Sequence, residues 1–317
     1  MGSSQGSGTQ DTGDARAQRP EQRRQQAAGG SYSFVRAPQP RGGAIASMIG
    51  YRVTDGDPFL HRGLPSPALT LVFSLDEPIV SGESAAHAES ARAYRTEIVV
   101  GGLHQRPAYV RQPSDQAGIQ LAVHPLAARA LLGIPARELT RIADEGSDVL
   151  GSQASLVREQ LCDQSGWAER FTTLTDFLRQ RAAAGAERGS GVRPEVAEAW
   201  RWLASRRGTG SMDGLARHVA LSARQLTTLF RQEVGMSPKQ VSRLMRWERA
   251  QQAVTSAVAD ERRPDLAAIA VRCGFYDHSH LVRDFHQYTG LSPTAWITEE
   301  RRNIQAGGHR NGEGWQV

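Results

Sequence analysis

The sequence predicts a multidomain α+β protein with a β-rich N-terminal domain, trailing helices and an all-helical C-terminal domain. Three observations support this fold class. Apolar and polar residues alternate up to about residue 125, which is the period of a half-buried strand. Beyond that point apolar residues recur every three or four positions, as in amphipathic helices. Near the C-terminus one helical pattern occurs twice. A length of 317 residues suits two domains with additional segments.

Charge is distributed unevenly along the chain. Residues 194–303 contain 16 basic and 12 acidic residues, whereas residues 31–193 contain 17 of each. A neutral body with a basic terminal unit is typical of a protein that binds phosphate groups through one domain. The two cysteines, Cys162 and Cys273, lie far apart, which argues against a disulfide framework and suits a reducing cytosol. No apolar run is long enough for a membrane span, so we expect a cytoplasmic protein.

The N-terminal half is expected to form a tail followed by strands. Residues 1–30 are rich in Ser, Gly, Gln and Arg and offer little to bury, which predicts a disordered tail. From residue 31 to about 125, short alternating runs punctuated by Pro and Gly predict a β-barrel or a β-sandwich. The clearest runs are Leu69 to Leu75, Glu97 to Val100 before Gly101-Gly102, and Ile119 to Val123.

Helical spacing replaces the alternation after Pro125. Three helices are predicted, and their apolar positions are Leu126, Ala130 and Leu131, then Leu156, Val157 and Leu161, then Trp167, Phe171, Leu174, Phe177 and Leu178. The β-rich domain, for effector binding or dimerisation, therefore spans residues 31–184. Residues 185–191 end in Gly and Ser without an apolar face, which predicts a linker. We assign residues 192–303 to the C-terminal domain and 304–317 to a flexible tail.

The C-terminal third repeats itself. The first copy runs from Leu215 to Pro238 and the second from Ile269 to Pro293. The matched pairs, each 55 positions apart, are Leu226 and Leu281, Phe230 and Phe285, and Gly235 and Gly290. In each copy a short helix stops at a small residue, and an apolar residue then fills the angle before the next helix. These residues are Ala220 and Leu221 in the first copy, and Gly274 and Phe275 in the second.

Capping signals delimit the second helix of each copy. Ser222 or Asp277 can accept hydrogen bonds from the free N–H groups at its start. Gly235 or Gly290 ends it, because the C-cap favours a left-handed backbone. A Ser-Pro pair then begins a further helix in each copy. These signals predict two helix-turn-helix motifs joined by a connecting helix, which extends from Pro238 to about Ala259.

These residues resemble the AraC family of transcription regulators. The resemblance rests on the paired Gly-Met-Ser-Pro and Gly-Leu-Ser-Pro closures, on Arg246-Trp247-Glu248-Arg249-Ala250, and on Ile269-Ala270 with Cys273-Gly274-Phe275. It covers about a hundred residues and implies a DNA-binding domain with two recognition helices. Thr255–Pro264 is longer than the family usually carries, and a looped insertion there would change the spacing of the motifs. A weaker resemblance over residues 50–180, through Gly50-Tyr51-Arg52, His61 to Pro65 and Leu132 to Pro135, points to the N-terminal domain of some such regulators.

The candidate DNA-binding residues are those of the recognition helices whose side chains do not point into the core. On the first recognition helix they are Arg224, Gln225, Thr227, Thr228 and Arg231. On the second they are His278, Ser279, His280 and Arg283. Arg can bind guanine through two hydrogen bonds, and Ser, Thr and His can bond to base edges or phosphates. The alternative is an ordinary solvated helix face. Arg246 on the connecting helix is a candidate for phosphate contact, or for an ion pair with Glu248 or its neighbours.

Other functions are less well supported by the sequence. The histidines of the β-rich domain lack the spacing of metal ligands, so no metal or cofactor is predicted. We find no phosphate-binding loop or nucleophile motif and predict a protein that is not an enzyme. The alternative is an enzyme domain, such as a metal-binding β-barrel, fused to a DNA-binding unit. The expected partners are double-stranded DNA, a small-molecule effector, a second copy of the chain and RNA polymerase, but not a membrane.

Overall fold

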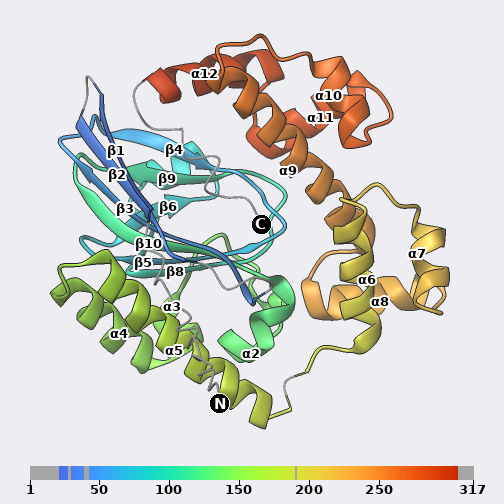
Figure 1. Ribbon diagram of the computed structural model, residues 1–317, viewed down its shortest axis with the longest axis horizontal. Helices are drawn as coiled ribbons and strands as arrows, with labels where there is room; N and C mark the ends of the chain where they lie inside the picture. The colour runs from blue at the N-terminus through green and yellow to red at the C-terminus, as the bar shows by residue number, and fades with distance from the viewer. Residues whose placement is uncertain (1–20, 28–29, 39–42, 190, 306–317) are drawn as a thin grey trace, which may run out of the picture.

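The computed structural model describes residues 21–27, 30–38, 43–189 and 191–305 of the chain. A β-rich N-terminal domain and a helical C-terminal domain lie side by side (Figure 1). The predicted α+β fold class is therefore confirmed. Within the described part of the chain, no helix has the length and apolar character that a membrane span requires.

The described residues of the N-terminal domain form two antiparallel sheets. The large sheet has the strand order β1-β2-β3-β10-β5-β8-β11, and the small sheet has the order β4-β9-β6-β7. The strands of the large sheet are β1 (Glu21–Ala27), β2 (Gly30–Arg36), β3 (Ile45–Thr54), β5 (Leu69–Ser74), β8 (Ile98–Gly101), β10 (Gln116–Val123) and β11 (Asp144–Glu145). Those of the small sheet are β4 (Phe59–Gly63), β6 (Ile79–Gly82), β7 (Tyr94–Thr96) and β9 (Ala108–Gln112).

Helices and the small sheet cover opposite faces of the large sheet. The helical elements of this domain are α1 (Ala85–Glu89), η1 (Pro125–Ala127), α2 (Ala128–Leu132), η2 (Ala136–Glu138), α3 (Gly146–Leu150), α4 (Ser152–Asp163) and α5 (Trp167–Glu187). Leu71 and Phe73 on β5 pack with Leu174 of α5 in the main core. Val72, on the opposite face of β5, packs against Ile79 of the small sheet. The order of layers is therefore helices, large sheet and small sheet (Figure 1).

Over residues 191–305, the described part of the C-terminal domain, the chain forms seven helices. They are α6 (Pro194–Ser205), α7 (Met212–His218), α8 (Ala223–Val234), α9 (Pro238–Ala259), α10 (Leu266–Cys273), α11 (His278–Thr289) and α12 (Pro293–Gln305). We call α7 with α8 the first head and α10 with α11 the second head. Trp247 of the connecting helix α9 is fully buried, and its ring centroid lies 4.9 Å from that of Phe285 in the second head. Trp200 and Cys273 are buried in the same core.

The two domains contact each other through side chains of α6, α8 and α12. Arg129 of α2 forms an ion pair with Glu233 of α8 in the first head, with an Nε–Oε1 distance of 2.7 Å. Arg62 of β4 forms an ion pair with Glu299 of α12, which follows the second head. The His124 and Trp200 rings meet edge to face with centroids 5.0 Å apart. Burial lowers the pKa of His124 and favours the neutral ring in this contact.

Three predicted boundaries differ from the structure. Glu21–Ala27, placed in the disordered tail, forms β1, because an edge strand needs only backbone hydrogen bonds to β2. The linker begins later than residue 185, because α5 continues to Glu187. Gly185 lies so close to α2 that a Cβ there would stand 2.6 Å from the Ala130 carbonyl oxygen. Helix α12 extends to Gln305, beyond the expected end of the C-terminal domain. Residues 1–20 and 306–317 of the predicted tails lie outside the described residues.

The long segment Thr255–Pro264 is only partly a loop. Its first five residues continue α9, which ends at Ala259. Thr255 and Val258 are buried in this last part of the helix. The predicted end of the connecting helix near Ala259 is therefore confirmed, and the loop before α10 is confined to residues 260–265.

Candidate nucleic-acid interface

The first recognition helix, α8, begins at a capping box. The Ser222 hydroxyl accepts a hydrogen bond from the Gln225 backbone N–H, and the Gln225 side chain accepts one from the Ser222 backbone N–H. Gly235 ends the helix with φ of 84°, in the left-handed region. Leu226 and Phe230 are buried on the inner face. These local signals orient the opposite face of α8 toward solvent.

The second recognition helix, α11, uses a simpler cap. The Asp277 carboxylate accepts a hydrogen bond from the His280 backbone N–H over 2.6 Å. Gly290 ends the helix with φ of 75°. Leu281 and Phe285 are fully buried, as the repeat predicts. Both heads thus have the helix-turn-helix form expected from the sequence.

Most candidate DNA-binding side chains lie on the surface. Six are exposed outside any capping role, namely Arg224, Thr228, Arg231, His278, Ser279 and Arg283. Thr227 is half-buried, and the hydroxyls of Thr227 and Thr228 donate to backbone carbonyls one turn earlier. His280 is half-buried with its ring against Phe275. DNA contact by any of these side chains remains a prediction.

Two of the candidates have partners within the domain. The Gln225 side chain is part of the capping box, although it is exposed. Arg246 on α9 donates to the Gly208 carbonyl over 3.1 Å, and its guanidinium lies 5.8 Å from the Phe275 ring centroid. Burial lowers the pKa of Arg246. Because Gly208 lies between α6 and α7 and Phe275 lies in the second head, Arg246 connects the segment before the first head to the turn of the second head.

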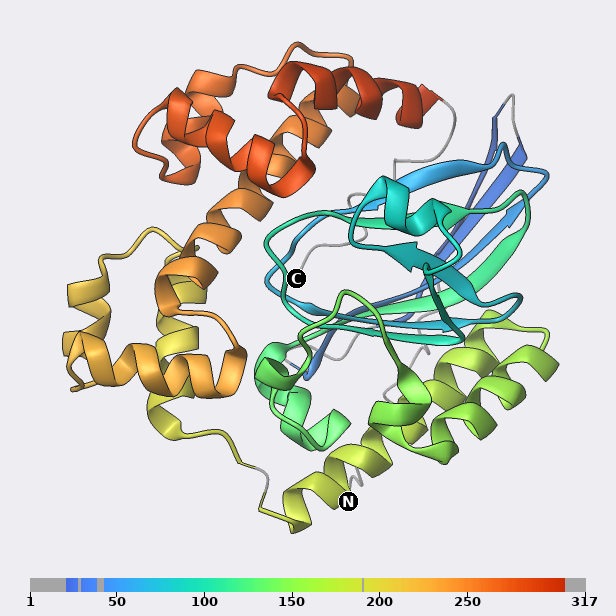
Figure 2. The same ribbon diagram turned by 180° about the vertical axis from the view of Figure 1, so that it is seen from behind.

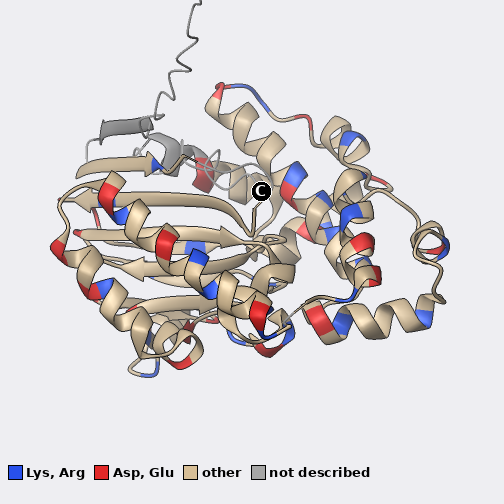
Figure 3. Cartoon of the chain, turned by 60° about the horizontal axis from the view of Figure 1, so that its bottom comes forward, with Lys and Arg blue, Asp and Glu red and all other residues tan. Residues whose placement is uncertain are grey.

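The acidic residues of both recognition helices are turned inward. Helix α8 contains one, Glu233, which pairs with Arg129 of the N-terminal domain. Helix α11 contains one, Asp284, which is fully buried and accepts from Arg243 Nε over 2.8 Å. The exposed faces of α8 and α11 therefore carry only basic and uncharged side chains. Helices α4 and α5, in contrast, show both signs interspersed (Figure 3).

The sequence reasoning missed Tyr276. This side chain is 91% exposed and directly precedes the N-cap of α11. The second motif has one residue more than the first between the apolar residue of the turn and the N-cap, and Tyr276 is that residue. The unequal spacing of Leu221 to Ser222 and Phe275 to Asp277 is the signal that identifies it.

Comparisons with known proteins agree with this geometry. Residues 215–299 match the family described as a helix-turn-helix domain. Among solved structures, apo ToxT from Vibrio cholerae strain SCE256 is 11% identical, with a TM-score of 0.44, and the match covers 82% of this chain and 99% of ToxT. The C-terminal domain of AraT, a response regulator from Geobacillus stearothermophilus, is 20% identical, with 35% and 87% of the chains covered and a TM-score of 0.30. An AraC-type regulator from Chromobacterium violaceum is 24% identical, with 35% and 92% covered and a TM-score of 0.28. No curated protein sequence matches the chain.

The fold and the candidate interface define a class of protein, a DNA-binding transcription regulator with a separate β-rich domain. Within that class, the C-terminal domain is a helix-turn-helix domain of the AraC type, because the family match spans both heads and the connecting helix. The resemblance predicted from the repeated motif is confirmed for this domain.

Proposed function

We propose that the protein reads a specific DNA sequence by placing α8 and α11 in successive major grooves, about one helical turn of DNA apart. The observation that supports this proposal most directly is the charge of the two exposed helix faces. Glu233 and Asp284, the only acidic residues of α8 and α11, are buried in ion pairs. The exposed faces of α8 and α11 therefore present no carboxylate that would repel DNA phosphates, and both present basic side chains that can bind them.

Within this proposal, residues on the two helices have different roles. Arg283 and Arg224 are exposed and are the best candidates to bind guanine through two hydrogen bonds. His278, Ser279 and Thr228 supply weaker polar contacts to bases or phosphates. Arg246 acts from within the domain by holding the segment before the first head to the turn of the second head, because its guanidinium already bonds to Gly208.

Binding to a selected duplex tests the proposal. The full chain is first used to enrich its preferred sequence from random DNA, and the affinity is then measured by fluorescence anisotropy at several salt concentrations. Arg283→Ala should weaken binding to the preferred site by about 1–3 kcal/mol and relax selectivity at one or two base pairs. Arg179→Ala, on α5 of the N-terminal domain, is the matched control and should change nothing. Equal affinity of the natural chain for preferred and random DNA would reject sequence-specific reading.

We infer that the N-terminal domain controls how the heads are presented. The support is structural, since Arg129 and Arg62 of this domain pair with Glu233 of α8 and Glu299 of α12. A small molecule, a second copy of the chain or RNA polymerase that binds this domain would act through these contacts. We propose that the protein works by binding in the cytoplasm and not by catalysis. A metal-dependent turnover by the N-terminal domain would favour the alternative, an enzyme domain fused to a DNA-binding unit.

A further inference from the structure

Among the residues that the structure describes, one face of the small sheet is not covered by another sheet. Its inner face carries Ile79 and Val110, which pack toward the large sheet. The residues between them along the strands point the other way, because side chains alternate across a strand. Helix α1 covers one part of this outer face, where Ala88 stands against Gly82. Figure 2 shows α1 over the small sheet.

Four side chains form a row across the uncovered part of this face. In the strand register, Leu60 of β4 pairs with Arg111 of β9, and Arg111 also pairs with Val80 of β6. Val80 in turn pairs with Arg95 of β7. Aliphatic and basic side chains therefore alternate over four neighbouring strands. Two strand spacings separate the backbones of Arg95 and Arg111, about 10 Å, so that both long side chains can reach a ligand above Val80.

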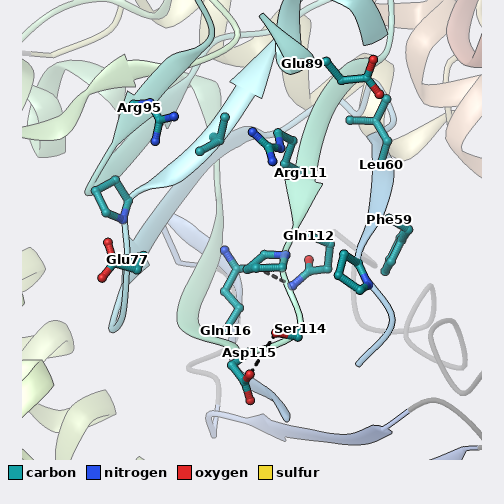
Figure 4. Close-up of a pocket in the computed structure, with 14 residues that line it drawn as sticks. Phe59, Leu60, Glu77, Glu89, Arg95, Arg111, Gln112, Ser114, Asp115 and Gln116 are labelled. Atoms are coloured by element: carbon teal, nitrogen blue, oxygen red, sulfur yellow. Dashed lines mark hydrogen bonds between the residues drawn. The ribbon is translucent and has the colours of Figure 1, made fainter. Parts of the chain in front are cut away.

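The two guanidinium groups are available to a ligand. Arg95 and Arg111 are exposed, and neither forms a hydrogen bond or an ion pair with a described residue. Arg129 at the domain contact and Arg243 inside the C-terminal domain are, in contrast, each paired with a carboxylate. In Figure 4, Arg95 and Arg111 stand at the same hollow. Two unpaired guanidinium groups beside one aliphatic side chain suit a carboxylate or phosphate that also carries an apolar body.

The hollow has the size of a small-molecule site. It encloses about 730 Å³ and extends from Arg95 and Arg111 to the ends of β4 and β9. Sites for small ligands commonly occupy about 300–1,000 Å³ and combine apolar walls with a few polar groups. Glu77, Glu89 and Asp115 also border it. These carboxylates can accept hydrogen bonds from ligand hydroxyl or amino groups, and they disfavour a ligand with several negative charges.

We propose that this groove, formed by Leu60, Val80, Arg95 and Arg111, binds a small organic acid that also carries a hydrogen-bond donor. Its acid group bonds to the two guanidinium groups, its apolar body rests on Val80 and Leu60, and its donor faces the bordering carboxylates. The inference deepens the proposed control by the N-terminal domain and rests on it only for a regulatory role, not for binding itself.

The groove also lies next to a contact between the domains. Arg62 and Tyr109 are two residues beyond Leu60 and Arg111 on the same strands, and they pair with each other in the register. They therefore belong to the same outer face. The Arg62 guanidinium lies 5.9 Å from the Tyr109 ring centroid and forms the ion pair with Glu299 of α12. An acid bound at Arg111 would place its negative charge two residues along the strands from the Arg62–Glu299 ion pair.

Calorimetric titration of the full chain without DNA tests the site. The probes are 4-hydroxybenzoate, phenyl phosphate and the neutral 4-hydroxybenzyl alcohol. We expect 4-hydroxybenzoate to bind, phenyl phosphate to bind more weakly because it carries more negative charge and lacks the hydroxyl donor, and the alcohol not to bind. The double variant Arg95→Gln/Arg111→Gln should weaken anion binding at least about tenfold, because two charge-assisted hydrogen-bonding groups are lost. Arg92→Gln, an exposed change outside the groove, should leave the dissociation constant unchanged.

Each outcome decides for or against the site. Tighter binding of 4-hydroxybenzoate supports the proposal, whereas tighter binding of phenyl phosphate would overturn the role of the donor and of the bordering carboxylates. Binding that survives in the double variant, equal binding of the neutral alcohol, or no heat with either anion at 10 mM would overturn the site itself. Circular dichroism of the double variant confirms that it folds. Because no DNA is present, failure of anion binding is separate from failure of DNA reading.

Discussion

The two heads of the C-terminal domain share one motif but are anchored to different parts of the protein. In the first head, the buried Glu233 pairs with Arg129 of the N-terminal domain. In the second head, the buried Asp284 pairs with Arg243 of the connecting helix α9. The first head is thus held from outside its domain and the second from within it. A change in the N-terminal domain can therefore reach the first recognition helix directly, whereas the second recognition helix moves with α9.

The heads also differ at the turn between their helices. Gly274 has φ of 78° in the second head, whereas Ala220 has φ of 54° at the matching point of the first. The left-handed region costs an alanine free energy that a glycine avoids. The turn of the second head also lies close to the segment before α7, since a Cβ at Gly274 would stand 2.5 Å from Thr209 Cγ2. Glycine is therefore required in the second turn, whereas alanine is tolerated in the first.

Removing the internal anchor of the second head should have the largest effect. Arg243→Met leaves the fully buried Asp284 without its cation, which should lower the free energy of unfolding of the C-terminal domain by about 3–5 kcal/mol. Urea unfolding followed by tryptophan fluorescence measures this, because Trp247 packs against Phe285 of the same head. Arg243→Met/Asp284→Leu is the control and should recover much of the loss. A double variant as unstable as the single one would contradict an internal anchor.

Removing the external anchors should have smaller and unequal effects. Arg129→Met leaves the Glu233 carboxylate, whose side chain is only 9% exposed, without its cation. This should lower the free energy of unfolding by about 1–3 kcal/mol. Arg62→Met leaves Glu299, which is 39% exposed, and should cost less than about 1 kcal/mol. Hydrogen exchange should show faster opening of α8 in the first variant and little change in α11. Equal opening of both helices would remove the distinction between the anchors.

Exchanging the turn residues should affect the two heads in opposite directions. Gly274→Ala should destabilise the second head by about 1–2 kcal/mol for the left-handed backbone, with a further cost for the approach of Thr209. Ala220→Gly should stabilise the first head by less than about 1 kcal/mol, since the relief of strain exceeds the extra entropy of the unfolded chain. Thermal unfolding of each variant measures both effects. Destabilisation by Ala220→Gly would show that the first turn is not strained.

A change at Glu248 of the connecting helix α9 should have the smallest effect on the difference in stability between the two heads. Burial raises its pKa from 4.5 to about 8, so the folded protein favours the protonated form. The unfolded chain releases this proton at lower pH, and stability should therefore fall as pH rises from about 4.5 to about 8. Glu248→Gln should be more stable than the natural chain at pH 8 and similar at pH 4.5. Urea midpoints at the two pH values test this, and a difference that does not depend on pH would contradict it.

Much of the C-terminal domain could be predicted because its signals are local. The caps at Ser222 and Asp277 bond to backbone groups three residues away, and the helix ends at Gly235 and Gly290 depend on single residues. The end of the connecting helix near Ala259 was predicted and is confirmed, whereas a looped insertion over Thr255–Pro264 stayed open, because it depends on what Thr255 and Val258 pack against. The direction of Arg246 was open for the same reason, since Gly208 and Phe275 approach it only in the folded domain.

The sequence alone therefore determined the class of fold, the two heads and the faces that their recognition helices expose. Periodicity and capping act over a few residues and leave a readable pattern. Tertiary structure alone decided the anchors and the groove. Arg129 and Glu233 are 104 residues apart, and Arg62 and Glu299 are 237 apart. The row from Leu60 to Arg95 depends on the register of four strands. Such contacts depend on how segments that are far apart in the sequence pack together, and no pattern over a few residues specifies that packing.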